Sequence, residues 1–429
     1  SFDTPYGKQM KRFLQNGVGL HHAGLLPKYR LLVENLAQKS LLKVISGTDT
    51  LGVGVNIPIR TVLFTKLYKF DGQQLRILRA RNFHQIAGRA GRKGFDEAGS
   101  VVCQAPVHVI ANKKLLAKAS SNAKGRRPKK VALQKPPKGY VGYNEDTFDA
   151  LIVAEPEALE SSFRVDPGIV TQTLQQGVTW QRYDGGYARL VKLIARCHDS
   201  PKRKSQHRQR AAQVLRALLD AGIAEHSYYE GSSRKYLRLK EGLQRNFSLH
   251  QSLAIFLLEA IFRLDQGLDT YPFDVLSVVE AVTENPRALI FRIEDKLKRQ
   301  RLAELKAEGV PYEERIEKLD EVTYPKPNAN FIYATFDDFR QKHPWLREFN
   351  VAPKGLALEM YDRYCTFNDY VLEYGLERSE GLLLRYLNQV YKSLAQSVPE
   401  EDKSEELYSL EAYLRSILQH VDDSLLREW

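Results

Sequence analysis

The chain has 429 residues, of which 43% are hydrophobic and 10% aromatic, a composition that excludes a disordered or fibrous protein. Its formal net charge of +12 and pI near 9.3 favour a polyanionic partner. No run approaches the ~18 continuous apolar residues that a membrane span needs, since Glu259 interrupts the longest candidate, residues 253–261.

The three cysteines, Cys103, Cys197 and Cys365, lie far apart, which excludes a local metal knuckle and argues against a disulfide framework. Together with the absence of a signal-peptide pattern, they predict a cytoplasmic protein that does not contact a membrane. The chain opens with Ser1 rather than Met. We therefore expect a piece of a longer protein, whose preceding residues hold part of the active site.

Residues 1–108 alternate between helical and strand patterns. The apolar run 41–45 is typical of a buried strand, and residues 61–64 and 100–103 predict two more. Helices between short strands indicate an α/β domain with a parallel sheet that helices cover on both faces.

Residues 109–143 predict a basic flexible loop, because ten Lys and Arg and no acidic residue lie between positions 111 and 138, alongside three prolines. It is either a solvated linker or a phosphate-contacting arm. Residues 144–180 predict a helical connector.

Residues 181–245 predict a winged-helix domain, since helical patterns at 185–198 and 205–221 precede a hairpin pattern at 228–237. Its basic run 201–204 is either a set of phosphate contacts or a solvated helix start. Residues 246–429 predict an all-α helical bundle. The helical patterns there span 253–264, 272–284, 286–308, 351–373, 381–397 and 405–426.

The run from Phe83 to Arg92 carries the clearest chemical pattern. Arg89 and Arg92 stand three apart and Gln85 one turn earlier, so on a helical turn all three point to one side. Gly88 lets the backbone approach a ligand closely. Guanidinium groups match phosphate geometry, and an arginine that reaches a triphosphate under cleavage contributes ~10³–10⁵ in rate. A solvated basic loop is the alternative.

Two other segments are rich in small residues. Ser46–Pro58 follows the first strand pattern, at the edge where open α/β sheets bind ligands, and offers Asp49 and Asn56. Residues 17–27 place two adjacent histidines in a glycine-rich turn. Adjacent histidines rarely bind one ion together, so we expect no metal there.

Taken in chain order, residues 17–27, 46–58 and 83–92 resemble motifs IV, V and VI of superfamily-two helicases. The resemblance is strongest to the Ski–Mtr (Ski-like, DExH-box) group of RNA helicases, of the bacterial type without the arch domain. The resemblance covers residues 15–106 and includes Lys69-Phe70-Asp71-Gly72. It implies that residues 1–108 are the second RecA-like domain, which binds ATP with Mg²⁺.

The roles implied for single residues follow from the same resemblance. Catalytic contacts with the γ-phosphate fall to Arg89 and Arg92, supported by Gln85. Cofactor-binding residues would be Gly52, Asp49, Asn56 and Gly88. Nucleic-acid-binding residues would be His22, Gly24, Thr48 and Thr50.

Looser resemblance continues past residue 108. Residues 148–163 resemble the connector of these helicases, and residues 374–381 with the helix that follows resemble their ratchet helix, which lies beside the nucleic-acid strand. Arg385 would contact a phosphate, and Tyr386 would either stack on a base or pack in the core.

The sequence contains no G-x-x-x-x-G-K-[ST] loop and no DExH box. We expect both, with the Mg²⁺ ligands and the first RecA-like domain, before residue 1, and we expect the 429 residues alone to be inactive. The whole protein is predicted to be a monomeric, ATP-dependent helicase that moves 3′-to-5′ on single-stranded or tailed RNA. The alternatives are a DNA repair helicase of the same group and a non-catalytic nucleic-acid-binding adaptor.

Overall fold

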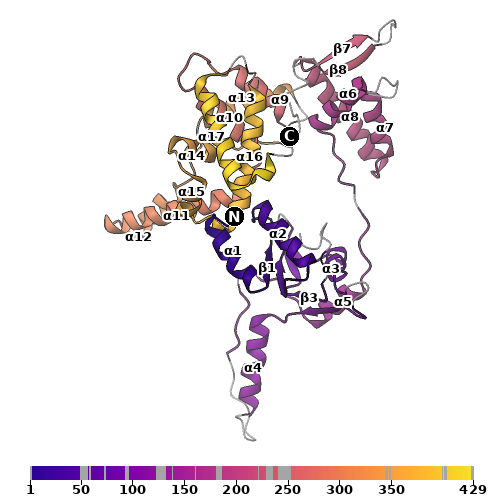
Figure 1. The fold of residues 1–429 in the computed structure, drawn as a ribbon, viewed down its shortest axis with the longest axis vertical. Coiled ribbons are helices and arrows are strands. Elements are labelled where there is room, and N and C mark those ends of the chain that lie inside the picture. Colours follow the sequence, from indigo (N-terminus) through magenta and orange to yellow (C-terminus); the bar gives the residue numbers. More distant parts are fainter. Residues whose placement is uncertain are drawn as a thin grey trace. The chain divides into compact units, whose positions relative to one another are not determined.

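The protein is described by a computed structural model that divides into two compact units (Figure 1). Unit 1 comprises residues 1–8, 24–28 and 160–429, and unit 2 comprises residues 9–23 and 29–159. The structure describes residues 2–48, 57, 59–71, 74–91, 96–121, 132–137, 139–159, 161–179, 186–220, 222–228, 235–239, 253–343, 346, 349–398, 400 and 403–426.

Within these residues the fold is mostly helical, with seventeen α-helices and four two-stranded sheets. In unit 2, β1 (Val18–His21) pairs in parallel with β2 (Val44–Gly47), and β3 (Thr61–Phe64) pairs in parallel with β6 (Ser100–Cys103). The antiparallel pair is β4 (Tyr68–Phe70) and β5 (Leu75–Ile77). The helices that lie wholly or partly in unit 2 are α1 (Pro5–Gln15), α2 (Pro27–Gln38), α3 (Ala80–Ala87), α4 (Val107–Ser121) and α5 (Glu145–Val153).

We expected a parallel sheet covered by helices on both faces. The described strands instead form separate pairs. The strands pair in twos, and one face of the β3–β6 pair is open, since Leu63 is 57% exposed. Strand β2 is not buried either, because Val44 is also 57% exposed. A strand is buried only where it has neighbours on both edges and cover on both faces, and β1 is the sole described neighbour of β2.

The covered face of β3 holds the core of unit 2. Val62 and Phe64 alternate with exposed neighbours, and the ring of Phe64 stacks on that of Phe83 in α3 at 4.9 Å between centroids. Phe148 of α5 meets Phe83 edge to face at 5.7 Å. This packing fixes α3, the helix of the Gln85 motif, against the strands and α5.

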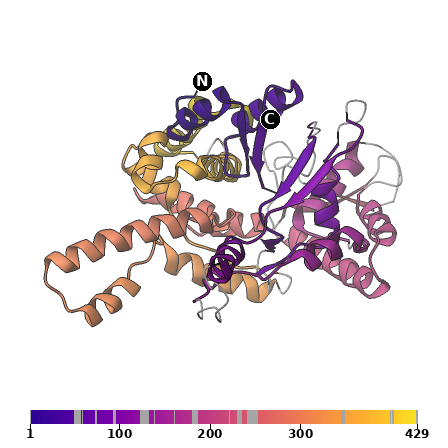
Figure 2. The ribbon, with the colours of Figure 1, turned by 90° about the horizontal axis from the view of Figure 1, so that it is seen from below.

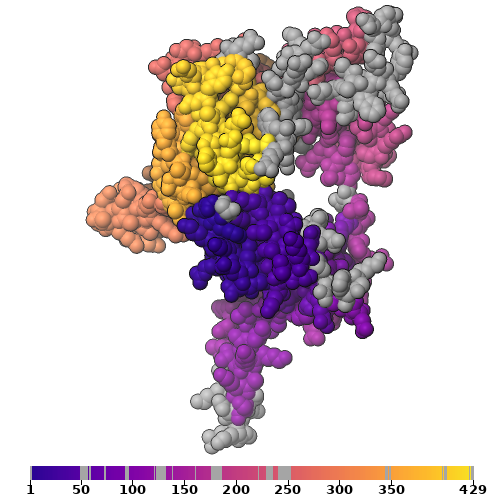
Figure 3. Space-filling view, in the orientation of Figure 1, coloured from indigo at the N-terminus to yellow at the C-terminus, as the bar shows by residue number. Residues whose placement is uncertain are grey.

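The basic stretch at 109–143, expected to be a loop, is partly a helix. Helix α4 runs to Ser121 because residues 107–121 contain neither proline nor glycine and are rich in alanine and leucine. The returning chain is tied to it where Asn112 and Gln134 exchange two hydrogen bonds, of 3.0 and 2.7 Å. In the space-filling view α4 stands clear of the rest of unit 2 (Figure 3).

Unit 1 contains the elements expected at 185–237. These are α7 (Tyr187–Arg196), α8 (Pro201–Asp220) and the antiparallel hairpin of β7 (Ala224–Tyr228) and β8 (Lys235–Leu239). Helix α6 (Pro167–Thr179), which we assigned to the connector, packs against α7, α8 and β8. Assignment of this part to the winged-helix class stays a prediction.

The rest of unit 1 is helical. Its elements are α9 (Ala254–Phe262), α10 (Tyr271–Val282), α11 (Arg287–Ala307), α12 (Tyr312–Asp320), α13 (Ala329–Lys342), α14 (Leu356–Asp362), α15 (Phe367–Tyr374), η4 (Glu377–Ser379), α16 (Glu380–Ser397), α17 (Glu405–Val421) and η6 (Asp423–Leu425). The sequence patterns missed α12 and α13 and gave α14 and α15 as one helix. Tyr364 (φ 49°) breaks that helix, and the Thr366 hydroxyl caps α15 by accepting from the Asp369 N–H at 3.2 Å. Helices α11 and α12 form a hairpin that extends from the bundle (Figure 2).

Two short N-terminal segments belong to unit 1 and are held at the start of α16 and the end of α17. The Gly381 N–H donates to the Gly24 carbonyl at 2.9 Å, and the Glu380 carboxylate accepts from the Tyr6 N–H at 3.0 Å. The Asp422 carboxylate accepts from the Lys28 N–H at 2.9 Å. Residues from the two ends of the chain therefore share one core. Across the described part of the chain, no helix is long and apolar enough to cross a membrane.

Candidate functional site

Helix α3 and the turn that follows it contain two of the three side chains predicted to contact phosphate, Gln85 and Arg89. Phe83 turns into the core, and Gln85 is exposed on the other side. Arg89 stands in the turn after the helix, where its N–H donates to the Ile86 carbonyl at 3.1 Å. The motif predicts that Gln85 and Arg89 point to one side of a helical turn. Because α3 ends at Ala87, that shared side stays a prediction. Arg92 lies outside the described residues.

The turn after α3 is built by close backbone contact. Gly91 has φ of 94°, a conformation that favours glycine, and its N–H donates to the Ile59 carbonyl at 2.8 Å. A Cβ on Gly99 would lie 2.4 Å from the carbonyl carbon of Ala90. Both glycines therefore let the strand at Ser100 run back beside the turn, which fixes the backbone that carries Arg89 and Gly88.

The N-terminus of α3 is capped from a distant part of the sequence. The Glu157 carboxylate accepts from the Ala80 and Arg81 N–H groups at 3.0 Å each. The Arg81 N–H, with help from Ala80, holds the pKa of Glu157 below its usual range. The imidazole Nε2 of His84 lies 3.0 Å from the Ala154 carbonyl oxygen. The sequence alone places Glu157 in the connector and gives no sign of this contact, because no local pattern links residues 76 or 77 positions apart.

The ends of β1 and β2 bring two further predicted segments together. The Thr48 N–H donates to the His21 carbonyl at 3.1 Å, which places the backbone of Thr48 beside the residue that precedes His22. His21 itself is buried and its Nε2 lies 2.9 Å from the Glu34 carboxylate, so this ring nitrogen has a partner within unit 2. Asp49, Thr50, Gly52 and Asn56 lie outside the described residues.

Gly24 occupies a different environment. It lies in unit 1, where its carbonyl accepts from Gly381, and Leu25 and Leu26 after it are buried. The structure thus gives Gly24 a packing role at the start of α16, whereas its predicted contact with nucleic acid remains a prediction.

Arg385 and Tyr386 of α16 have opposite environments. Arg385 is about half exposed and its guanidinium lies 3.2 Å from the Glu284 carboxylate. Tyr386 is 3% exposed, and its hydroxyl donates to the Glu280 carboxylate at 2.6 Å. A base cannot stack on a ring enclosed in this way, so the predicted stacking role of Tyr386 is wrong and the core alternative holds.

The partner of Tyr386 is itself fully buried. The Glu280 carboxylate also accepts from the N–H groups of Ala357 (2.8 Å) and Leu358 (3.2 Å), and burial raises its pKa. The Lys354 ammonium donates to the carbonyls of Glu280 and Thr283, and burial lowers its pKa. The Glu280 carboxylate thus fixes the end of α10 against the start of α14 and against α16.

Beside Arg385 runs a groove of about 240 Å³ between α16 and the segment from Glu284 to Leu289. Arg385 and Gln389 line it from α16, and Asn285 and Arg287 line it from the segment. The Arg385–Glu284 ion pair lies at the surface, where such pairs contribute ~0–1 kcal/mol, so an anionic ligand can compete for the guanidinium.

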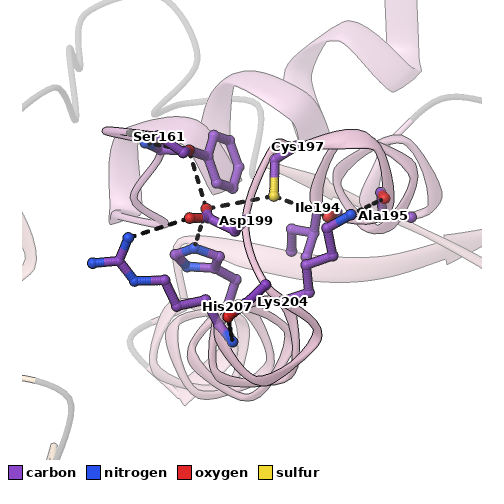
Figure 4. A network of polar contacts seen from close by, with 10 residues as sticks. Ser161, Ile194, Ala195, Cys197, Asp199, Lys204 and His207 are labelled. Atoms are coloured by element: carbon purple, nitrogen blue, oxygen red, sulfur yellow. Dashed lines mark hydrogen bonds and ion pairs between the residues drawn. The ribbon is translucent and has the colours of Figure 1, made fainter. Parts of the chain in front are cut away.

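A second polar groove, of about 530 Å³, lies between residues 161–165 and α8. Three of its lining residues contact the Asp199 carboxylate, which accepts from Ser161 and lies 3.1 Å from His207 and 3.4 Å from Arg203 (Figure 4). Burial raises the pKa of Asp199, but the hydrogen bonds from His207, Ser161 and Cys197 outweigh it and lower that pKa overall. The basic run 201–204 forms the first turn of α8 here, and the Lys204 ammonium donates to the Ala195 carbonyl at 2.8 Å.

Similarity to known proteins is confined to part of the chain. It is 46% identical over 100 residues to the DExH-box ATP-dependent RNA helicase DExH11 of Arabidopsis thaliana, 43% over 103 residues to the antiviral helicase SKI2 of Saccharomyces cerevisiae, and 41% over 98 residues to the human exosome RNA helicase MTR4. These matches cover 23%, 24% and 23% of this chain but only 7%, 8% and 9% of the relatives. A region of about 100 residues is therefore helicase-related.

A family model matches most of the chain. Residues 105–429 match the family described as "Domain of unknown function (DUF3516)", and the chain belongs to that family.

Proposed function

We propose that this chain is the C-terminal part of an ATP-dependent RNA helicase of the Ski–Mtr type. In this proposal unit 2 acts as the second RecA-like domain, and residues before Ser1 supply the phosphate loop, the DExH box and the Mg²⁺ ligands. ATP with Mg²⁺ is hydrolysed between the two RecA-like domains, and the released energy moves the protein 3′-to-5′ along single-stranded RNA.

One observation carries the proposal: α3, which contains Gln85, and the turn after it, which contains Arg89, are both held in place by contacts with distant parts of unit 2. Glu157 holds the start of α3, and the Gly91–Gly99 backbone contact holds the turn after it. A positioned guanidinium stabilises charge that develops on a transferring phosphoryl group without reorganising at that moment. The helicase-related similarity over a length close to that of the motif region, residues 15–106, supports the same role.

The chemistry assigned to this chain is electrostatic. Arg89 and Arg92 would stabilise the negative charge on the γ-phosphate as its bond to the β-phosphate breaks, and Gln85 would hold them or the attacking water in place. Asp49, Gly52, Asn56 and Gly88 would shape the nucleotide site. Mg²⁺, when bound, neutralises charge on the β- and γ-phosphates.

The nucleic-acid contacts fall on two sets of residues. His22, Thr48 and Thr50 would meet the phosphate chain at the ends of β1 and β2, where parallel strands present their ligand-binding edge. Arg385 would contact a phosphate from α16, in the groove that it shares with Gln389. The relatives' names supply the preference for RNA over DNA.

ATP hydrolysis by the full-length protein tests the proposal. We expect RNA-stimulated turnover, and a fall in kcat of about 10³-fold or more in Arg89→Ala or Arg92→Ala. Arg60→Ala is the matched control, because Arg60 is an exposed arginine of unit 2 outside the motif and should leave kcat unchanged.

Duplex unwinding distinguishes the alternatives. Unwinding of 3′-tailed RNA with ATP supports the proposal, whereas unwinding of DNA alone would assign the protein to DNA repair. RNA binding without any ATP hydrolysis would make it a non-catalytic adaptor. Appreciable turnover by residues 1–429 alone would show that the division of the site between this chain and preceding residues is wrong.

A further inference from the structure

A pocket of about 410 Å³ opens in unit 1 between the start of α11 and two segments around residues 324–333 and 351–354. Its volume lies within the ~300–1,000 Å³ typical of small-ligand sites. The side chains that matter are Arg287 and Phe291 of α11, with Tyr324, Lys326, Tyr333 and Lys354. None of the roles derived above uses this pocket.

Two aromatic rings of the pocket are unusually accessible. Phe291 is 70% exposed and Tyr333 is 42% exposed, although rings of this size are normally buried. Tyr324, which also lines the pocket, is buried, and its N–H donates to the Glu294 carboxylate at 3.0 Å. Accessible ring faces at the mouth of a pocket offer stacking surface to a planar ligand.

The charges around these rings are mainly positive. Among the described lining residues, Arg287, Lys326 and Lys354 are cationic and Glu294 is the single acid. Arg287 and Lys326 are exposed, whereas Lys354 is buried, with its ammonium donating to backbone carbonyls. Rings flanked by exposed cations fit a base that is joined to phosphates.

The pocket continues the groove beside Arg385. Asn285 and Arg287 line both cavities, so the segment between α10 and α11 forms the wall that they share. A single strand that follows Arg385 and Gln389 would therefore bring its next nucleotides to this wall. A docked protein is less well matched, because the accessible apolar surface is two rings and not the ~800 Å² of a stable interface.

We propose that this pocket receives an unstacked base of single-stranded RNA. The base stacks on Phe291 and Tyr333, while Arg287 and Lys326 contact the phosphates on either side of it. The inference rests on the proposed function, since it adds a base-binding pocket to the strand path along α16.

Affinity for a fluorescent 12-nucleotide oligouridylate, measured by anisotropy with the 429-residue chain, tests the pocket. We expect Phe291→Ala to weaken the Kd about 5- to 150-fold, the range for loss of one base–aromatic stack. Tyr312→Ala is the matched control, since Tyr312 of α12 is also 70% exposed but lies outside the pocket. It should leave the Kd unchanged.

A set of oligouridylates with one abasic position each makes the test specific. Loss of the base at one position should weaken binding by the unchanged chain but not by Phe291→Ala, because the missing base and the substitution remove the same stacking contact. If the unchanged chain and Phe291→Ala bind RNA equally well, the pocket proposal is overturned and the exposed rings would instead contact a protein partner. The helicase proposal would then still stand. If the unchanged chain binds no RNA, both proposals fall.

Discussion

Substitution of Gly381 by alanine should loosen the start of α16 selectively. A Cβ at this position would lie 2.1 Å from the carbonyl oxygen of Leu25 and 2.4 Å from its carbonyl carbon. Both atoms belong to the backbone of a buried segment, so the neighbour cannot rotate away as a flexible side chain would. Either α16 or residues 24–28 must move.

The size of the effect follows from three terms. Overpacking costs ~1–3 kcal/mol, and loss of the Gly381–Gly24 hydrogen bond costs about 0.5–1.5 kcal/mol more. Alanine returns roughly 0.5–1 kcal/mol because it is the better helix residue. The net loss is then about 2 kcal/mol, which corresponds to a population of locally opened α16 increased about 30-fold.

Hydrogen exchange read by mass spectrometry measures this locally. Amides of residues 380–397 and 24–28 should exchange about 30-fold faster in Gly381→Ala, provided that they exchange by local opening. Gly142→Ala is the control, because a Cβ there meets nothing within 4 Å and should change no exchange rate. Unchanged exchange of residues 380–397 in Gly381→Ala would refute the reasoning.

Two further predictions concern α16 and pH. Arg385→Ala should weaken RNA binding and reduce the slope of log Kd against log salt concentration by about 0.7, the value for one phosphate on a single strand. Tyr386→Phe should leave RNA affinity unchanged. It should destabilise unit 1 by roughly 1.5–3 kcal/mol, because it removes one hydrogen-bond donor from the buried Glu280 carboxylate. An equal loss of affinity in the two variants would contradict this division. For His343, burial lowers the pKa below 6.5 in the folded state although Glu259 and Asp220 oppose it, so the unfolded chain takes up the proton first. Stability should therefore fall as pH drops through 6.5, and urea midpoints at pH 7.5 and 5.5 should converge in His343→Asn; an undiminished pH dependence would be the contrary result.

Elements that depend on local pattern could be predicted from the sequence. The helical spacing at 381–397 gave α16 to within a residue. The pattern at 228–237 predicted a hairpin, and β7 and β8 form one over residues 224–239. The motif also predicts a helical turn at Gln85, but α3 ends at Ala87 and Arg89 lies in the turn after it, so the phosphate contacts of both residues stay predictions.

Features that depend on distant partners could not be predicted. Nothing near Tyr386 shows that Glu280, 106 positions away, encloses its hydroxyl. Likewise, the alternation of β3 shows which residues share a face but not whether a second layer covers Leu63. Glu157 is the clearest case, since a carboxylate in an extended connector has no pattern of its own until the fold places it at the start of α3.

The sharing of one core by residues 1–8, 24–28 and the C-terminal helices sets an order on folding during synthesis. Lys28 cannot contact Asp422 until 394 more residues have been synthesised, and Tyr6 likewise cannot contact Glu380 before Glu380 is made. Residues 29–159 of unit 2 are complete long before either partner leaves the ribosome, so this unit can form first. Residues 1–8 and 24–28 therefore pack only after the C-terminal helices have been made. A stalled or truncated product would expose Leu25 and Leu26, which are buried in the folded protein, to chaperones and proteases.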